Sequence, residues 1–184
     1  MRLTQEQSFK WLLSEYSRSH ETLRYYDGLR ESLVKFGLSV LSILGVTGTT
    51  VREFTPDSGL LSGILFLTGG LVSLMVSLML AQNRCYIALT ARQINSIRKV
   101  FVEACPVEYE NWFYTDPRFP PMWRFRSIHI QTLIFFILMT ACFMGVAVWI
   151  WTGAICWGIL ASLLIGGALT SSIRWVFLRE VRPC

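Results

Sequence analysis

Four apolar stretches constrain this chain more than any other feature, because each is about as long as a helix that crosses a bilayer. Such a helix needs about 20 mostly apolar residues. The stretches run over residues 33–51, 59–81, 128–151 and 153–178. Charged residues make up only 16% of the chain, whereas soluble domains carry about 25%. We therefore expect an all-α polytopic membrane protein with four transmembrane helices in two hairpins.

The basic residues indicate how these helices are oriented, because Lys and Arg are enriched in cytoplasmic loops. Of the 17 Lys and Arg residues, only Arg52 lies between the first and second stretches, and none lies at the turn near Thr152. We therefore expect both termini on the cytoplasmic side of the plasma (inner) membrane. The expected segments are a cytoplasmic amphipathic helix (1–32), a transmembrane hairpin (33–81), a cytoplasmic helix with an aromatic, Pro-rich loop (82–127), a second transmembrane hairpin (128–178) and a cytoplasmic tail (179–184).

The first apolar stretch is unusually polar for a membrane span. It contains Ser39, Ser42, Thr47, Thr49 and Thr50 together with Gly45 and Gly48. Small and hydroxyl-bearing residues are typical of helix contacts inside a membrane. We therefore expect the first helix to be shielded by neighbouring helices rather than surrounded by lipid.

Two apolar seams are expected on the cytoplasmic side. The first, in the amphipathic helix that precedes the first span, includes Leu12 and Tyr16. No helix-breaking residue follows Ala81 before Pro106, so the second span is expected to continue as one helix from Gly59 to Cys105. The seam on this continuation contains Ile87, Ile94, Ile97 and Phe101. The two seams either pack together within one chain or also pack between chains as a cytoplasmic collar.

Small residues recur at four-residue spacing in two of the spans. The fourth span carries Ala154, Gly158, Ser162, Gly166 and Thr170, and the second has a sparser stripe of Gly59, Gly63, Gly70, Ser73 and Ser77. Such ladders let helix backbones approach closely. Because these stripes exceed what one four-helix bundle requires, we predict a homo-oligomer in the lipid bilayer.

A pore through such an oligomer could use two groups of residues. Gly70, Ser73 and Ser77 are candidates for the pore lining. Arg174 lies near the inner end of the fourth span and has two interpretations. It either extends to the phosphate headgroups or forms a ring of cations at the inner mouth of the pore.

Other kinds of chemistry find little support in the sequence. The middle of the spans contains no Asp, Glu, Lys or Arg, which disfavours coupled transport. With only His20 and His129 and no phosphate-binding loop, we expect no enzyme, no catalytic residue, no metal and no cofactor. The aromatic residues of 106–127 could stack on bases. That loop leads directly into a membrane helix, so we expect it at the headgroup level, with no nucleic-acid partner.

The segment from Thr4 to Cys105 places an amphipathic helix, a membrane hairpin and a basic cytoplasmic helix in that order. This layout resembles SLATT-type membrane effectors of bacterial conflict systems. The resemblance implies a protein that forms pores when a cytoplasmic sensor signals. The second hairpin, Ile128 to Leu178, departs from the layout, and no functional residue is transferred from that family.

Two functions fit these patterns. The first is an oligomeric, channel-like or pore-forming membrane protein that is controlled from the cytoplasmic side. The second is a non-conducting membrane anchor or scaffold whose cytoplasmic helices recruit a soluble protein partner. We favour the channel, because an anchor needs only one or two spans.

Overall fold

The computed structural model describes residues 5–54, 58–104, 115–116 and 118–179. Within these ranges the chain forms four helices, α1 (Gln5–Phe54), α2 (Gly59–Ala104), α3 (Ile128–Thr152) and α4 (Ile155–Arg179). All four are long and apolar enough to cross a membrane. The all-helical class and the four apolar helices expected from the sequence are therefore confirmed.

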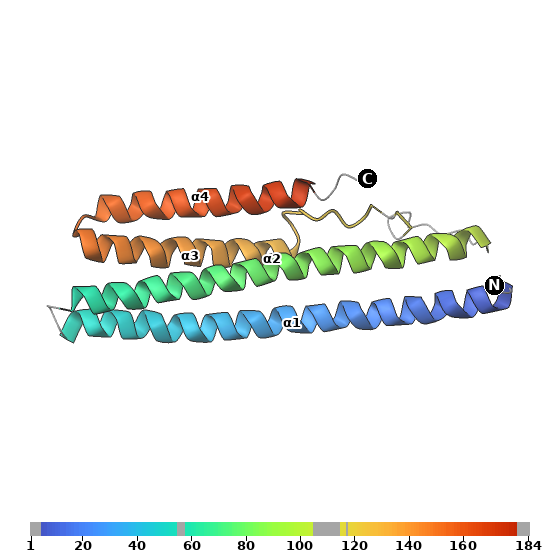
Figure 1. The fold of residues 1–184 in the computed structure, drawn as a ribbon, viewed down its shortest axis with the longest axis horizontal. Helices are drawn as coiled ribbons and strands as arrows, with labels where there is room; N and C mark the ends of the chain where they lie inside the picture. Colours follow the sequence, from blue (N-terminus) through green and yellow to red (C-terminus); the bar gives the residue numbers. More distant parts are fainter. Residues whose placement is uncertain (1–4, 55–57, 105–114, 117, 180–184) are drawn as a thin grey trace.

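Helices α1 and α2 are about twice as long as α3 and α4, with 50 and 46 residues against 25 each. At 1.5 Å per residue, α1 is about 75 Å long. The surplus length of α1 and α2 projects at one end of the molecule, which we call the extended end (Figure 1). The expected continuation of the second span as one long helix is confirmed as far as Ala104, while the predicted ends at Thr4 and Cys105 lie outside the described residues.

The helices pack in chain order, α1 on α2, α2 on α3 and α3 on α4 (Figure 1). The core lies mainly between α2 and α3, and its fully buried members include Val76, Leu133 and Phe136. Phe136 also reaches α1, because a Cβ atom on Gly37 would lie 2.5–2.8 Å from its ring. Gly37 therefore lets α1 approach α3 across the edge of α2.

The turn between α3 and α4 depends on one glycine. Gly153 ends α3 with a φ of 70°, a left-handed conformation that side chains with a Cβ rarely adopt. Its N–H donates to the carbonyl oxygen of Trp149 at 2.9 Å. The chain therefore leaves α3 and begins α4 two residues later, at Ile155.

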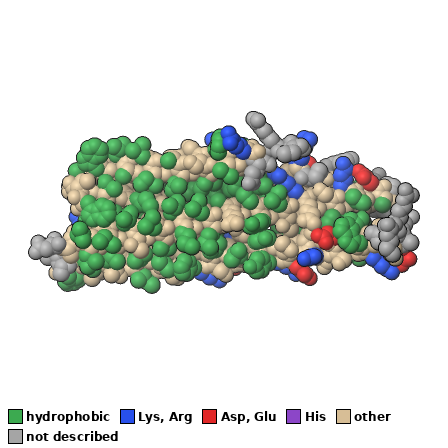
Figure 2. All heavy atoms as spheres, in the orientation of Figure 1, with side chains coloured by type: hydrophobic (Ala, Val, Ile, Leu, Met, Phe, Trp, Pro, Cys, Tyr) green, Lys and Arg blue, Asp and Glu red, His purple; other side chains and the backbone are tan. Residues whose placement is uncertain are grey.

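Hydrophobic side chains cover most of the surface where the four helices run together, and charged groups gather toward the extended end (Figure 2). Leu60 on α2 is 71% exposed and Leu163 on α4 is 70% exposed. A soluble protein rarely exposes so wide an apolar surface. The surface is consistent with a membrane protein.

Candidate functional site

The three residues of α2 predicted to line a pore are buried inside the chain. Ser73 Oγ donates to the carbonyl oxygen of Phe136 on α3 at 2.9 Å, and Ser77 Oγ donates to the carbonyl oxygen of Ser73. Neither serine is exposed to solvent. A Cβ on Gly70 would lie 2.6 Å from Met144, so this glycine also serves the contact with α3. Within one chain Gly70, Ser73 and Ser77 therefore join α2 to α3, and this arrangement gives no support to the predicted pore lining, which stays a prediction.

The small-residue ladder of α4 faces α3 of the same chain. A Cβ on Gly158 would lie 2.7 Å from the carbonyl oxygen of Gly145. Ser162 Oγ donates to the carbonyl oxygen of Ala141 at 3.0 Å. A Cβ on Gly166 would contact the Cβ of Ala141. The flanking ladder positions, Ala154 and Thr170, are half-buried. Since this ladder serves a contact within the chain, it no longer supports the predicted homo-oligomer.

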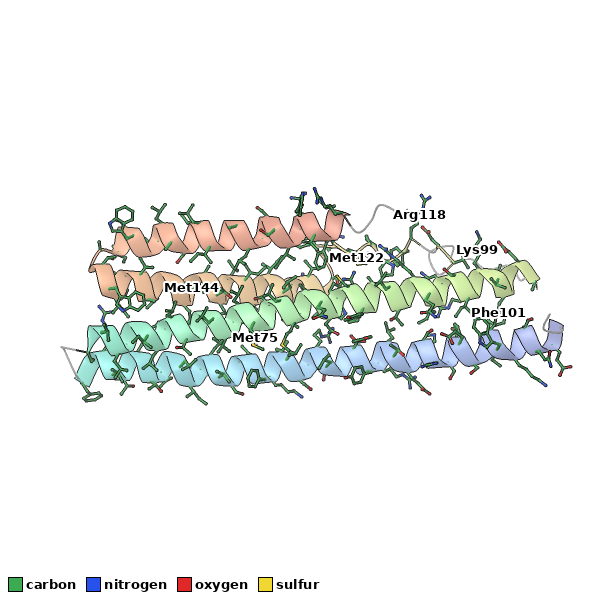
Figure 3. All side chains as sticks on the ribbon, viewed as in Figure 1. Met75, Lys99, Phe101, Arg118, Met122 and Met144 are labelled. Carbon is green, nitrogen blue, oxygen red and sulfur yellow. The ribbon has the colours of Figure 1, made fainter. Side chains whose placement is uncertain are left out.

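The apolar seam predicted on the extended part of α2 is buried within the chain. Ile87, Ile94 and Ile97 are each less than 7% exposed. Phe101 meets Phe9 of α1 edge-on, with ring centroids 5.1 Å apart (Figure 3).

On the α1 side of this contact, Tyr16 accepts hydrogen bonds from both Nε and Nη2 of Arg98, at 3.2 and 3.1 Å, and Leu12 is half-buried. Ser19, which interrupts the apolar seam of α1, is only 4% exposed. The pairing of α1 with α2 within one chain, one of the two alternatives raised by the sequence, is therefore present.

The apolar part of α1 carries a polar stripe that none of the other three described helices covers. We define the hydroxyl stripe as Ser39, Ser42, Thr49 and Thr50, which are all exposed and lie on one side of the helix. The buried residues of this part, Gly37, Leu41 and Gly48, lie on the opposite side. The expectation that this helix is shielded by neighbours is therefore not met within one chain.

Charged residues lie at both ends of the hydroxyl stripe, and one apolar residue interrupts it. Lys35 and Glu53 lie on the same side of α1 at the two ends of the stripe, and Val46 is its only apolar interruption. Ser39 Oγ donates to the carbonyl oxygen of Lys35, and Thr49 Oγ1 to that of Gly45, so these hydroxyls are satisfied by the helix itself. Their oxygen atoms remain free to accept from water.

A polar cluster joins α1 to the first turn of α3. Arg30 Nη1 lies 3.2 Å from Nε2 of His129, and Asp27 lies 3.4 Å from the same guanidinium and 3.6 Å from the imidazole. The side chains of Arg30 and His129 are less than 20% exposed. The cluster fixes the register of α1 against α3 at the level where the extended end begins.

A second polar cluster was missed by the sequence argument. Residues 115–116 and 118–127, which we call the strap, return along α2 from the extended end to α3 (Figure 1). Arg84 is only 3% exposed. It donates from Nε to the carbonyl oxygen of Met122 at 3.1 Å and from Nη2 to that of Pro121 at 2.8 Å. Burial lowers the pKa of Arg84, and the neighbouring cations Arg92 and Arg124 lower it further, although Cys85 acts in the opposite direction.

Two further side chains of α2 hold the strap. Asn95 Nδ2 donates to the carbonyl oxygens of Phe119 and Asp116, at 2.8 and 3.1 Å. Arg92 Nε donates to the carbonyl oxygen of Pro120 at 3.3 Å. The backbone carbonyl oxygens of the Pro-rich strap are not taken up by hydrogen bonds within a helix. Side chains of α2 donate to them instead, and these bonds hold the strap against α2. We call the hydrogen bonds from Arg84, Arg92 and Asn95 to the strap the clamp. The only sequence signal for the clamp is that these three residues share one side of α2, away from its apolar seam.

Arg174 is exposed on the last turns of α4. It lies on α4, whose main helix contact is with α3, whereas the hydroxyl stripe lies on α1. Among the described residues, no group of three or more His, Cys, Asp or Glu side chains could hold a metal ion. Comparisons of the chain with protein-family models, with curated proteins and with solved structures gave no match.

Proposed function

We propose that the chain crosses the plasma (inner) membrane four times, as two hairpins with both termini in the cytoplasm, and assembles into an oligomeric channel-like protein. In this proposal the hydroxyl stripe of α1 lines a water-filled path. The positions of the basic residues support the orientation, because only Arg52 lies on the proposed outer side. The extended end is then the cytoplasmic, controlling part.

The observation that carries the proposal is the contrast between the exposed faces of two neighbouring helices. On α2 the exposed residues of the apolar part are mostly large and hydrophobic, such as Leu60, Leu71 and Met75. On α1 the corresponding outward face carries four hydroxyls between Lys35 and Glu53. Lipid-facing surfaces are apolar, whereas surfaces that contact water inside a membrane are polar. The face of α2 is suited to lipid and that of α1 to water.

A single chain does not shelter this stripe, and this favours an oligomer. The apolar residues Phe36 and Ile43 along one edge of the stripe are 58% and 65% exposed, and Leu38 at its other edge is 40% exposed. In a ring of copies these flanks would contact neighbouring chains, and the hydroxyls would face the central axis. The continuous helices α1 and α2 would then connect the axis to the cytoplasmic part of the same chain.

Liposome flux with cysteine modification tests the proposal. The five native cysteines are replaced by serine, and Ser42→Cys or Thr49→Cys is introduced singly. We expect a charged, water-soluble thiol reagent to react with both and to reduce ion flux by severalfold. Thr68→Cys is the matched control, because Thr68 is an exposed hydroxyl in the apolar part of α2. Modification of Thr68→Cys with the same effect, or no ion flux from any preparation, contradicts the channel.

A scaffold is the second candidate, and one observation favours it. A cavity of about 330 Å³ lies at the extended end between α1 and α2, lined by apolar and aromatic groups that include Phe9, Leu13 and Val102. Phe9 and Leu13 are each more than half exposed. Such a surface is suited to a soluble protein partner. Protein that passes no ions yet forms a stoichiometric complex with a soluble cytoplasmic protein supports the scaffold over the channel.

A further inference from the structure

A line of large hydrophobic side chains follows the outer side of α1 over most of its length. We define the outer ridge by six residues that are between 36% and 79% exposed: Trp11, Tyr25, Leu29, Phe36, Ile43 and Phe54. Their separations are sums of four and seven residues, which return to the same side of a helix with 3.6 residues per turn. Two exposed residues, Arg18 and Thr47, fill the gaps in this line. At 1.5 Å per residue the ridge is about 65 Å long.

None of the other described helices covers the outer ridge. Helix α1 lies at the edge of the row of helices, with α2 packed against its other side (Figure 1). The buried residues of α1, which are Ser19, Gly37, Leu41 and Gly48, lie about a third of a turn away from the ridge. Within the described part of one chain, the ridge is therefore a face without a partner.

The aromatic members of the outer ridge offer much of the area that a stable contact needs. Trp11, Tyr25, Phe36 and Phe54 are each more than half exposed. A fully buried aromatic side chain contributes about 150–250 Å², so the exposed halves of these four would bury about 400 Å² per chain. An interface of standard size buries about 800 Å² per partner, and the aromatic residues alone supply about half of it.

The outer ridge passes from the apolar part of α1 into the extended end, where charged groups gather (Figure 2). Phe36 and Ile43 lie within the apolar stretch 33–51, whereas Trp11, Tyr25 and Leu29 precede it. Under the proposed orientation, lipid tails can cover Ile43 but not Trp11, and a soluble protein can cover Trp11 but not Ile43. A partner that covers the whole ridge must itself continue from the bilayer into the cytoplasm.

A second copy of the chain supplies such a partner, because its α1 crosses the same boundary. Copies related by an axis normal to one membrane share one orientation, so their α1 helices run parallel at the same depth. Leu13 and Leu38, on the opposite edge of the exposed face of α1, are 55% and 40% exposed. They follow the ridge residues Trp11 and Phe36 by two positions and lie about 3 Å further along the helix axis. The ridge of one copy can therefore meet the leucine edge of the next.

We infer that the outer ridge docks on α1 of a second copy of this chain, with the two helices parallel, so that one contact runs from the bilayer to the cytoplasmic end. The inference rests on the proposed oligomer and names the surface that builds it. Because the ridge and the leucine edge are different surfaces, the contact is heterologous and repeats from copy to copy, as a ring requires. The hydroxyl stripe lies between these two surfaces and would face the axis of the ring.

Native mass spectrometry of the full chain in mild detergent, over a dilution series, measures the association. We expect the natural chain to form an oligomer. The double variant Tyr25→Ser/Leu29→Ser is expected to weaken association by about tenfold for each side chain removed. Its matched control is Leu89→Ser/Val100→Ser, which removes two apolar side chains of α2 that are 51% and 45% exposed. This control is expected to associate as the natural chain does.

A second pair of variants tests whether the same contact continues inside the membrane. Phe36→Ala/Ile43→Ala removes two ridge residues from the apolar part of α1 and is expected to weaken association to a similar extent. Leu71→Ala/Met75→Ala removes two residues of α2 that are 52% and 60% exposed and suited to lipid, and it is expected to leave association unchanged.

The one charge in the line of the ridge allows a test by gain rather than loss. Arg18→Leu fills a gap in the ridge with an apolar side chain and is expected to strengthen association. Arg24→Leu is the matched control, because Arg24 is exposed on α1 away from the ridge, and it is expected to have no such effect.

The outcomes separate the docking surface from the channel. Ridge variants that associate like the natural chain, equal losses in the α2 variants, or a loss confined to one part of the ridge overturn the inference, while an oligomer that conducts ions leaves the channel standing. A natural chain that stays monomeric, with its ridge covered by lipid or by a soluble protein, overturns the inference together with the oligomeric channel.

Discussion

Removing the guanidinium of Arg84 is expected to release the strap from α2. Arg84→Met keeps an unbranched apolar stem but loses both bonds to the carbonyl oxygens of Pro121 and Met122. A hydrogen bond from a charged donor contributes about 1.5–3 kcal/mol. Two such bonds at the lower limit amount to about 3 kcal/mol, and 1.4 kcal/mol corresponds to about tenfold in an equilibrium constant. The open population of the strap should therefore rise by about two orders of magnitude.

Amide hydrogen exchange over residues 115–127, followed by mass spectrometry, measures this population directly. The N–H groups of Phe119 and Ser127 donate within the strap at 3.1 and 2.8 Å and report its opening. Asn95→Ala removes two neutral bonds of about 1 kcal/mol each and should give a smaller effect, of about 30-fold. Arg118→Gln is the control, because Arg118 is an exposed arginine of the strap whose bond to Asp116 uses its backbone N–H. Unchanged exchange in Arg84→Met, or an equal rise in Arg118→Gln, would refute this account of the clamp.

Three further predictions concern packing and titration. Gly158→Leu should destabilise the contact of α4 with α3 by about 1–3 kcal/mol, because the new Cβ would meet the backbone of α3. Gly167→Leu should not, because Gly167 has open space around it. Thermal unfolding in detergent measures the difference. Ser73→Ala should cost about 0.6 kcal/mol in the same assay through its lost bond to α3, and the exposed Thr68→Ala should cost less. Burial together with Arg98 and Arg24 lowers the pKa of His20, so the fold favours its neutral form, and stability should fall as the pH drops below about 6.5. Thermal unfolding between about pH 7.5 and about pH 5.5 should show this loss in the natural chain and a smaller one in His20→Phe, and equal losses in both would exclude His20 as its source.

The positions and lengths of the helices along the chain were predictable because they depend on averages over long stretches of sequence. An apolar run from Gly59 to Ala81, followed by an apolar seam without a helix breaker as far as Pro106, leaves one long helix as the simplest outcome. The seam residues Ile94 and Ile97 are buried as helical periodicity implies. These features need no knowledge of which helix lies opposite.

The roles of single polar residues were not predictable in the same way. Ser73 on α2 and Ser42 on α1 have the same side chain in similarly apolar surroundings, yet Ser73 is fully buried and Ser42 is exposed. The difference depends on which face of each helix meets α3, and composition does not contain that information. The contacts between α2 and the strap could not be predicted from the sequence for another reason. Their acceptors are backbone carbonyls, such as that of Met122, which leave no side-chain pattern in the sequence.

The unbroken course of α2 has a mechanical consequence. Arg84 and the strap hold this helix near its midpoint, with about 35 Å of rigid rod on either side. The strap also binds this helix at Arg92 and Asn95, and α1 packs beside it, so α2 is clamped over several turns and has no hinge there. Because one continuous helix joins the two ends, a displacement of the tip near Ala104 reaches the strap through hydrogen-bonded backbone, with no loop in between to absorb it.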